Sequence, residues 1–232
     1  YYAQWTPIVA STTIGSTTTK YSTVQAAVNA AGTNSGATVT LLEPRRDESI
    51  TIASGQNINF DLNGRILEST TGVTITNNGT LTLKGSGKVS GSIADTIVNN
   101  GTFVKNGTST IDNTTTKEYR PFRNKTTSSV ATLNEGTLTC SNTEIGTSYR
   151  YIIVNNGTLT VAGATIKADL ANSGYERGII NNSANAKVSV NSGNIITNGM
   201  AIYNANGTLN TTSSPAIKIA GGTIEAKKAE TI

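Results

Sequence analysis

The segment VTITNNGTLTL at residues 73–83 decides the fold of this 232-residue chain. Close copies of it occur as IVNNGTFVK at 97–105 and as IVNNGTLTV at 153–161. The first asparagine of the motif recurs at intervals of 22 to 31 residues, each time two residues after an apolar side chain, which gives the column Asn77, Asn99, Asn124, Asn155, Asn181 and Asn204. A unit copied at such a period is the signature of a solenoid. We therefore predict one supersecondary unit that is stacked repeatedly along an axis.

The unit itself has the two-residue period of a β-strand. Between residues 73 and 89, apolar side chains alternate with threonines, which is typical of a strand buried on one face. Three short strands can be placed in each unit: the first ends at the asparagine column, the second follows Gly-Thr, and the third follows a further glycine such as Gly85 or Gly163. Three strands and about 22 residues per coil describe an all-β parallel β-helix.

One strand column is predicted to point inward through successive coils: Leu81, Leu83, Phe103, Leu138, Leu159, Val161, Val188, Val190, Ile217 and Ile219. Cys140 takes the position of Leu83 in its coil and is expected to be a small buried hydrophobe. Lys105 also aligns with the inward Leu83. We therefore expect either that the register of this coil shifts or that the lysine side chain escapes from the core to solvent. The same frame also fits the coil before Asn77. It places Ile52 at the apolar position of the first strand, Ser54 at the asparagine position and Ile66 in the third strand.

The Asn-Asn-Gly-Thr segment suits a turn between two strands of one coil. Glycine supplies the positive φ that other residues adopt only with strain, and asparagine tolerates left-handed conformations. At the strand spacing of about 4.8 Å, successive asparagine side chains can also bond to one another along the axis. We interpret the column as a structural ladder of turns, and a polar ligand stripe is the alternative.

The N-terminal region differs from the repeats. Residues 11–20 are rich in threonine and serine and are expected to be a linker. The sequence STVQ at 22–25 is a capping box that opens a short amphipathic helix over 22–31. An open β-helix end exposes apolar core and unpaired backbone, so this helix is expected to be its cap. We thus divide the chain into a preceding module and linker at 1–19 and a capped β-helix at 20–232.

Composition narrows the range of functions. The formal charge is +4, from 18 basic and 14 acidic residues without a continuous basic stripe, which argues against a nucleic-acid partner. No apolar run approaches the roughly 18 residues of a membrane span, so membrane insertion of this segment is not expected. The single cysteine permits no intramolecular disulfide, and the chain has no histidine. We expect neither a cofactor nor a metal.

Several segments carry a family resemblance: YSTVQAAV at 21–28, ATVTLL at 37–42, DLNG at 61–64 and NNGTLTL at 77–83. They resemble the pectate-lyase-like right-handed β-helix regions of large surface proteins of Gram-positive, gut-type bacteria. The opening YAQW at 2–5 resembles the last strand of the Listeria–Bacteroides repeat modules that often precede such regions. The resemblance implies a right-handed helix, an extracellular location at the bacterial cell surface, and an adhesin, stalk or carbohydrate-binding scaffold. We expect a monomeric piece of a longer polypeptide.

A candidate ligand surface lies where tyrosines and arginines cluster in the middle coils. The segments YRPFR at 119–123, YRY at 149–151 and YER at 175–177 belong to three adjacent units, which also contain the longest insertions. Insertions in a solenoid map to loops, frequently on the binding face, and aromatic planes suit sugar rings. We predict contact with glycans or with a host or microbial surface protein through Tyr119, Arg120, Phe122, Arg123, Tyr149, Arg150, Tyr151, Tyr175 and Arg177. The alternative is that their long stems merely cover strand edges.

Two other functions are open to this sequence. A polysaccharide lyase or hydrolase needs clustered carboxylates, and the closest grouping is Asp47 and Glu48 beside Arg45. The remaining carboxylates are scattered over different coils, so we predict a non-catalytic adhesin or scaffold. Stacked Thr-x-Thr pairs on a flat face could bind ice, but Val104 and Ser189 interrupt the threonine column, and exposed threonine is a good strand residue in any case.

Overall fold

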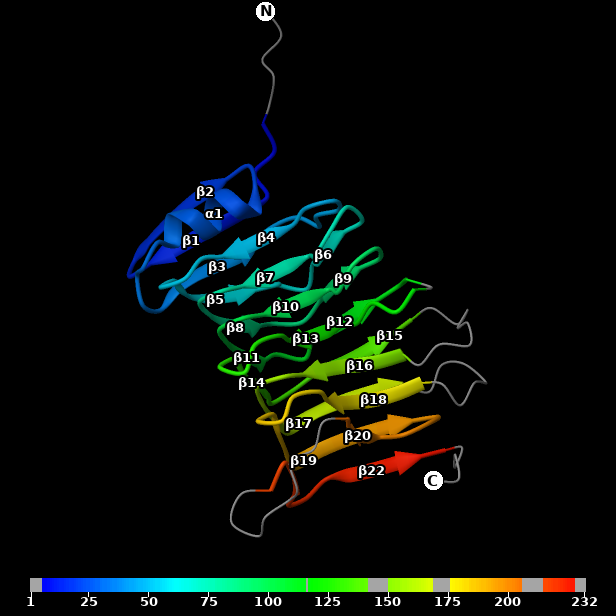
Figure 1. Ribbon diagram of the computed structural model, residues 1–232. Helices are drawn as coiled ribbons and strands as arrows, with labels where there is room; N and C mark the ends of the chain where they lie inside the picture. Colours follow the sequence, from blue (N-terminus) through cyan, green and yellow to red (C-terminus); the bar gives the residue numbers. More distant parts are fainter. Residues whose placement is uncertain (1–5, 116, 142–149, 169–175, 206–214, 228–232) are drawn as a thin grey trace, which may run out of the picture.

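The computed structural model describes residues 6–115, 117–141, 150–168, 176–205 and 215–227. These residues form a parallel β-solenoid of about six turns with almost no helix (Figure 1). The prediction of an all-β parallel solenoid is confirmed. The turns stack from the blue N-terminal strands to the red strand β22 (Thr223–Ala226), so the axial neighbours of a residue come from the turns before and after it.

A β-hairpin stands at the N-terminal end of the solenoid. β1 (Ala10–Ile14) pairs antiparallel with β2 (Thr17–Tyr21) and, on its other side, with β3 (Ala37–Leu41). The expectation of a linker over residues 11–20 is therefore wrong. Its threonines are β-branched and favour extended backbone, so a segment whose composition resembles a linker extends the sheet instead.

The helix expected over residues 22–31 is present but shorter, as α1 (Val24–Ala31), and its N-cap is Thr23 and not the Ser22 of the predicted capping box. It begins after Thr23, whose hydroxyl accepts a hydrogen bond from the backbone N–H of Ala26 at 3.1 Å. Its apolar face enters the core through Val24, Ala27, Val28 and Ala31. In Figure 1 it lies beside β1 and β3 at the blue end of the molecule.

Seven parallel strands form the first sheet, in the order β4 (Ile50–Ile52), β7 (Ile75–Asn77), β10 (Ile97–Asn99), β13 (Phe122–Asn124), β16 (Arg150–Asn155), β18 (Glu176–Asn181) and β20 (Ile202–Asn204). Each apolar residue that precedes the asparagine column pairs with its counterpart in the next turn, from Ile75 to Ile202. The asparagines themselves pair in the same way. The alignment read from the sequence is therefore the actual register from β7 to β20.

The other strands form one 15-stranded sheet that contains two further columns. The second column includes β5 (Asn57–Asp61), β8 (Thr80–Lys84), β11 (Thr102–Asn106), β14 (Val130–Leu133) and β21 (Ile217–Ile219). The third includes β6 (Ile66–Ser69), β9 (Lys88–Gly91), β12 (Thr110–Asn113), β15 (Thr137–Cys140) and β22. Two long strands, β17 (Thr158–Ala168) and β19 (Lys187–Thr197), run through both columns, and their register shifts around Gly163, where φ is 151°. Ile219, predicted to point inward, is 58% exposed because β21 pairs only with β19 within the described residues.

One register prediction in the middle of the chain is wrong. Leu138 pairs with Ile111 in the third column and not with the second column, and Cys140 follows it there. The inward positions of the second column are filled by Ala131 and Leu133. In this turn the Gly-Thr signal at 136–137 precedes the third strand instead of the second, so the sequence motif marks a different corner. Both Leu138 and Cys140 are nonetheless buried, as expected.

The predicted frame of the first turn is also shifted. Ile50, not Ile52, takes the first apolar position, so Ser54 lies beyond the asparagine position. In the third column Leu67 is fully buried, whereas Ile66 is 38% exposed. This turn lacks the Asn-Asn-Gly-Thr marker, and two equally spaced isoleucines fit the strand pattern in either frame.

The asparagine column forms a continuous chain of side-chain hydrogen bonds along the axis. Each Nδ2 donates to the Oδ1 of the next asparagine, at 2.7, 2.8, 2.8, 2.9 and 3.1 Å from Asn77 to Asn204. The same amides also donate to backbone carbonyls at the corner, for example from Asn77 to Thr102 O at 2.8 Å. Asn77 through Asn181 are fully buried. The column therefore satisfies buried polar groups that would otherwise destabilise the turns from β7 onward.

Lys105 lies inside the solenoid without a shift of register. It pairs with Leu83 and Leu133 in the second column and is fully buried. Its ammonium reaches the corner and donates to Gly107 O at 2.6 Å and to Ser109 Oγ at 3.0 Å. Burial lowers the pKa of Lys105 to about 8, although Glu135 partly offsets this effect. The register does not shift and the lysine does not reach solvent, so both predicted alternatives are wrong. The ammonium stays inside because oxygen atoms of Gly107 and Ser109 at the corner accept its hydrogen bonds.

The Asn124→Ala substitution tests the ladder. It removes the bond that Asn99 donates and the bonds to Asn155, Ser129 and Thr158, so we expect a loss of about 2–3 kcal/mol in unfolding free energy, measured by urea denaturation. The matched control is Asn78→Ala, because Asn78 is exposed and accepts one side-chain bond. It should change stability by less than about 0.5 kcal/mol. Equal losses in the two variants would show that the buried column has no special role.

The Lys105→Met substitution tests the cost of the buried ammonium. Methionine fills similar space without charge, so the unfolding free energy at pH 7 should rise by about 1–3 kcal/mol. The pKa of Lys105 in the folded protein, about 8, lies below the 10.5 of an exposed lysine, so wild-type stability should increase by about 3 kcal/mol between pH 8 and pH 10.5. The variant should lack this increase, whereas Lys84→Met, at a partly exposed lysine of β8, should retain it. Parallel pH profiles for wild type and Lys105→Met would contradict the assignment.

Candidate binding face

The outward side of the first sheet changes character along the axis. The central residues of its strands, in register, are Thr51, Thr76, Val98, Arg123, Val154, Ile180 and Tyr203. Threonine thus gives way to apolar, arginine and tyrosine side chains from β10 onward. Strand alternation points Val98 and Val154 away from the core, yet they are only 8% and 6% exposed, so other outer side chains cover them.

Charged and aromatic side chains gather around this column. We call the following residues the Arg-Tyr face: Asp95, Arg120, Arg123, Tyr151, Arg177 and Tyr203. Asp95 and Arg120 stand two residues before β10 and β13, respectively. Tyr151 and Arg177 lie near the starts of β16 and β18. Arg123 and Tyr203 are the central residues of β13 and β20. Five successive turns therefore contribute to one surface, because strands of the first sheet repeat in register.

Asp95 holds two arginines at one end of the Arg-Tyr face. Its carboxylate lies 3.0 Å from Arg123 Nε and 3.9 Å from Arg120 Nη1, and it accepts the backbone N–H of Arg120 at 2.9 Å. The side chains of Arg120 and Arg123 are 21% and 32% exposed, whereas that of Asp95 is 7% exposed. Burial lowers the pKa of the Arg120 guanidinium, and the charge of Asp95 opposes this. One buried carboxylate thus organises two half-buried cations.

Arg177 lies between two tyrosines at the other end of the face. Its guanidinium carbon is 5.7 Å from the ring centroid of Tyr151 and 5.6 Å from that of Tyr203. Its Nη1 also donates to the hydroxyl of Tyr151 at 2.9 Å. Arg177 is 5% exposed and Tyr203 is 38% exposed. The buried cation therefore fixes the orientation of two partly exposed rings through cation–π contact.

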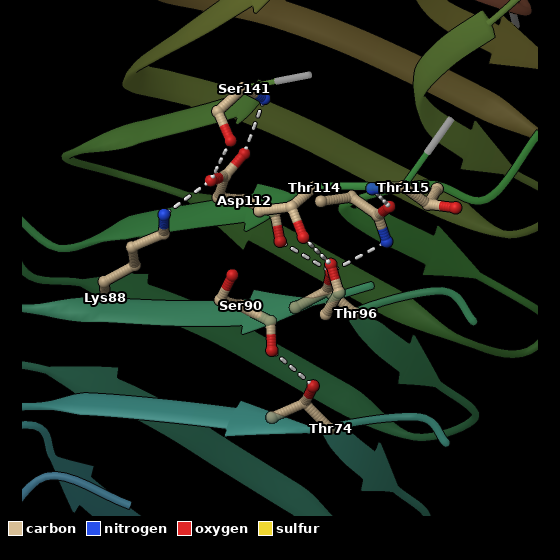
Figure 2. Close-up of polar contacts among 10 residues, drawn as sticks. Thr74, Lys88, Ser90, Thr96, Asp112, Thr114, Thr115 and Ser141 are labelled. Atoms are coloured by element: carbon tan, nitrogen blue, oxygen red, sulfur yellow. Dashed lines mark hydrogen bonds and ion pairs between the residues drawn. The ribbon is translucent and has the colours of Figure 1, made fainter. Parts of the chain in front are cut away.

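Buried hydroxyls fix the corner that carries Asp95. Figure 2 shows Thr74 and Thr96, which occupy equivalent positions one turn apart and donate at 2.6 Å to the carbonyls of Ser90 and Asp112. The amide of Asn113 adds bonds to Thr96 Oγ1 at 3.1 Å and to the carbonyl before Asp95 at 2.8 Å. Thr96 N in turn donates to the carbonyl of Arg120 at 2.8 Å. Hydrogen bonds consequently hold the backbone on both sides of Asp95 and the carbonyl of Arg120.

A second polar group in Figure 2 belongs to the third column. The carboxylate of Asp112, 1% exposed, accepts from Ser141 N at 2.8 Å and Ser141 Oγ at 2.7 Å, and lies 2.6 Å from Lys88 Nζ. These three residues come from β9, β12 and the end of β15. All of the described contacts of the carboxylate are donors from its own chain, so the group joins three turns.

The structure changes the set of predicted contact residues. Phe122 is fully buried with its ring 5.0 Å from that of Phe103, so its prediction as a ligand contact is wrong. Arg150 is 4% exposed, donates to the carbonyl of Lys117 at 3.1 Å and lies beside Cys140, so it supports the interior. Tyr119 is partly exposed. The remaining two predicted residues, Tyr149 and Tyr175, lie outside the described residues.

Tyr203 belongs to the face but is not among the predicted contact residues. It stands outside the Tyr-Arg segments, in the short copy AIYN at 201–204. The repeat register is the feature of the sequence that points to Tyr203, because this residue occupies the position of Arg123 three turns further along the column. Of the predicted contact residues, the structure brings Arg120 and Arg123 together at Asp95, and it brings Tyr151 together with Arg177.

The acidic grouping considered for catalysis has structural contacts. Glu48 accepts the backbone N–H groups of Val24 at 2.6 Å and Gln25 at 3.2 Å, and its other oxygen bonds Arg45 Nε at 2.8 Å. It therefore binds the N-terminus of α1, where a carboxylate is favoured. Asp47 has a left-handed φ of 58° and accepts a hydrogen bond from Thr70.

The described residues contain neither a metal-site cluster nor a membrane-spanning helix. Within the described residues, no three histidine, cysteine, aspartate or glutamate side chains come together as a metal site would require. No helix in the same part of the chain has the length and apolar character needed to cross a membrane. In comparisons with known proteins, no family model, curated protein or solved structure matches the chain.

Proposed function

We propose that this protein is a non-catalytic binding scaffold, which presents the Arg-Tyr face to a glycan. The observation that carries the proposal is the stack of Tyr151, Arg177 and Tyr203, in which a buried cation orders two partly exposed rings. Exposed aromatic rings of fixed orientation provide the flat apolar planes on which sugar rings pack. Because the rings are already ordered, little conformational entropy is lost when a ligand binds.

The axial arrangement favours an extended polymer over a small molecule. The residues of the face come from turns that repeat at about 4.8 Å, so contacts recur along a line and not around a closed pocket. A polysaccharide chain lying along this line could contact several turns at once. Continuous backbone pairing and a close-packed interior make such a platform stiff.

A bacterial surface location fits this activity. We propose that the chain is one segment of a multidomain secreted protein, in which the solenoid is a rod and the face supplies adhesion. The support is the resemblance of residues 21–83 to β-helix regions of Gram-positive surface proteins. On the same basis we propose a right-handed helix with three strands per coil and α1 as its cap, and the apolar contacts of α1 with the core support the capping role.

The runner-up is a polysaccharide lyase or hydrolase, and we place it second. Glu48 and Asp112 already accept several hydrogen bonds from their own chain, and Asp95 is paired with two arginines. A general acid or base needs a site from which it can exchange a proton with substrate. Nothing about these carboxylates favours that role over a structural one.

A glycan array probed with wild-type protein, Tyr151→Ala and Tyr203→Ala tests the proposal. Each substitution removes one ring of the stack, so binding should weaken about tenfold or more. The control is Val130→Ala, at a 39% exposed side chain of the second column, which should bind like wild type.

Release of reducing or unsaturated ends is measured on the glycans that bind. We expect no release. Cleavage by the wild type would show that the protein is an enzyme and not a scaffold. Binding that survives in both tyrosine variants would show that the ligand binds to another surface.

A further inference from the structure

We propose that the glycan bound by the Arg-Tyr face is anionic, with its carboxylate or sulfate groups seated on Arg120 and Arg123. This inference rests on the proposed function, because it names the chemistry of the ligand at the same face. It concerns the end of the face where the two arginines share Asp95, next to the tyrosine stack.

The local charge is strongly unbalanced. The segment KEYRPFRNK at 117–125 contains four basic residues and one acidic residue, and Asp95 is the carboxylate that pairs with it. The resulting net charge is +2 over a few residues, half of the +4 carried by the whole chain. Lys117 and Lys125 are exposed, so the positive potential extends around the arginine pair.

The two arginines are pre-ordered and incompletely satisfied. Asp95 holds both guanidinium groups within 3.9 Å, which removes much of the side-chain entropy that binding would otherwise cost. Arg120 Nε is buried and has no hydrogen-bond partner among the described residues. A carboxylate or sulfate that approaches the pair can accept charge-assisted hydrogen bonds from both groups.

The position of the pair suits a glycan that also contacts the rings. Arg120 and Tyr151 each stand two residues before an apolar anchor, and these anchors, Phe122 and Ile153, pair in successive turns. The arginine pair and the tyrosine stack are therefore neighbours along the axis. Arg177 is 5% exposed and serves as a positioning residue for the rings, so Arg120 and Arg123 are the cations of the Arg-Tyr face that a ligand can reach. A chain that places a sugar on Tyr151 thus brings an acidic substituent of its next unit near the pair.

Three dextrans separate charge from sugar chemistry, because they share one backbone: neutral dextran, carboxymethyl dextran and dextran sulfate. We expect wild type to bind at least one anionic form about tenfold or more tightly than neutral dextran, with affinity that falls as salt rises. Comparing the two anionic forms tells carboxylate from sulfate.

Variants of the ion-paired group give predictions of opposite sign. Arg123→Gln should weaken binding of the anionic dextran about fivefold or more, because one charge-assisted contact is lost. Asp95→Asn should strengthen it by about threefold: the variant loses part of the order that the carboxylate imposes on the two arginines, but the amide oxygen can still accept the Arg120 N–H, and removal of the competing negative charge has the larger effect. The matched control is Arg46→Gln, at a side chain 81% exposed and outside the face, which should bind like wild type.

The outcomes distinguish this inference from the proposed function. Neutral glycans bound as tightly as the anionic forms, with loss in Tyr151→Ala but not in Arg123→Gln, would overturn the anionic ligand and leave the scaffold proposal intact. Weaker anion binding in Asp95→Asn would also overturn it. Binding of a single-stranded oligonucleotide more tightly than either anionic dextran would assign the face to nucleic acid instead. Failure of every glycan to bind would refute both proposals.

Discussion

The structure depends on strands of the first sheet stacking in constant register from one turn to the next. The buried asparagine column enforces this register, because each side chain can donate to its successor at 2.7–3.1 Å only if the asparagines face one another directly. A slip by one residue would reverse every side chain between core and solvent. It would also leave the buried amides without partners, which costs about 1–3 kcal/mol for each group. The asparagine ladder therefore specifies the register between neighbouring strands. The apolar interior alone would allow the strands to slip relative to one another.

The same constraint builds the Arg-Tyr face. Turns of 22 to 31 residues differ in the length of their loops, yet the ladder returns each chain segment to the same axial line. Residues far apart in sequence, such as Asp95 and Tyr203, consequently occupy one side of the first sheet. The outward positions are free to vary because the inward asparagines and isoleucines carry the fold. In this protein the outward variation runs from threonine in β4 and β7 to arginine and tyrosine in the later turns.

The sequence predicts the architecture well wherever the Asn-Asn-Gly-Thr marker is present, since its period and its strand alternation agree there. The expected reason for the glycine is wrong, because Gly79, Gly101 and Gly157 do not have a positive φ. Glycine is needed there because a Cβ would lie 2.1–2.5 Å from a backbone carbonyl oxygen. Where the marker is missing, as at Ile50 and Leu133, alternation alone leaves the frame ambiguous and the prediction fails. Segment composition misleads at residues 11–20, because threonine favours both loops and strands. For the face, sequence proximity finds the arginines but wrongly includes Phe122, whose direction depends on strand parity. It also omits Tyr203, whose place beside Arg177 is visible only after the turns are stacked.

The most direct test of constant register is a pair of disulfide cross-links in the first sheet, made in a Cys140→Ser background. Val154 and Ile180 pair directly on the outer side, at the separation between neighbouring strands that a disulfide spans. The Val154→Cys/Ile180→Cys variant should therefore oxidise to an intramolecular disulfide while the fold is retained. The Val154→Cys/Asn181→Cys variant places its thiols on opposite faces and should stay reduced. Efficient cross-linking of the second pair, with none in the first, would show a slipped register and contradict the whole account of the ladder and the face.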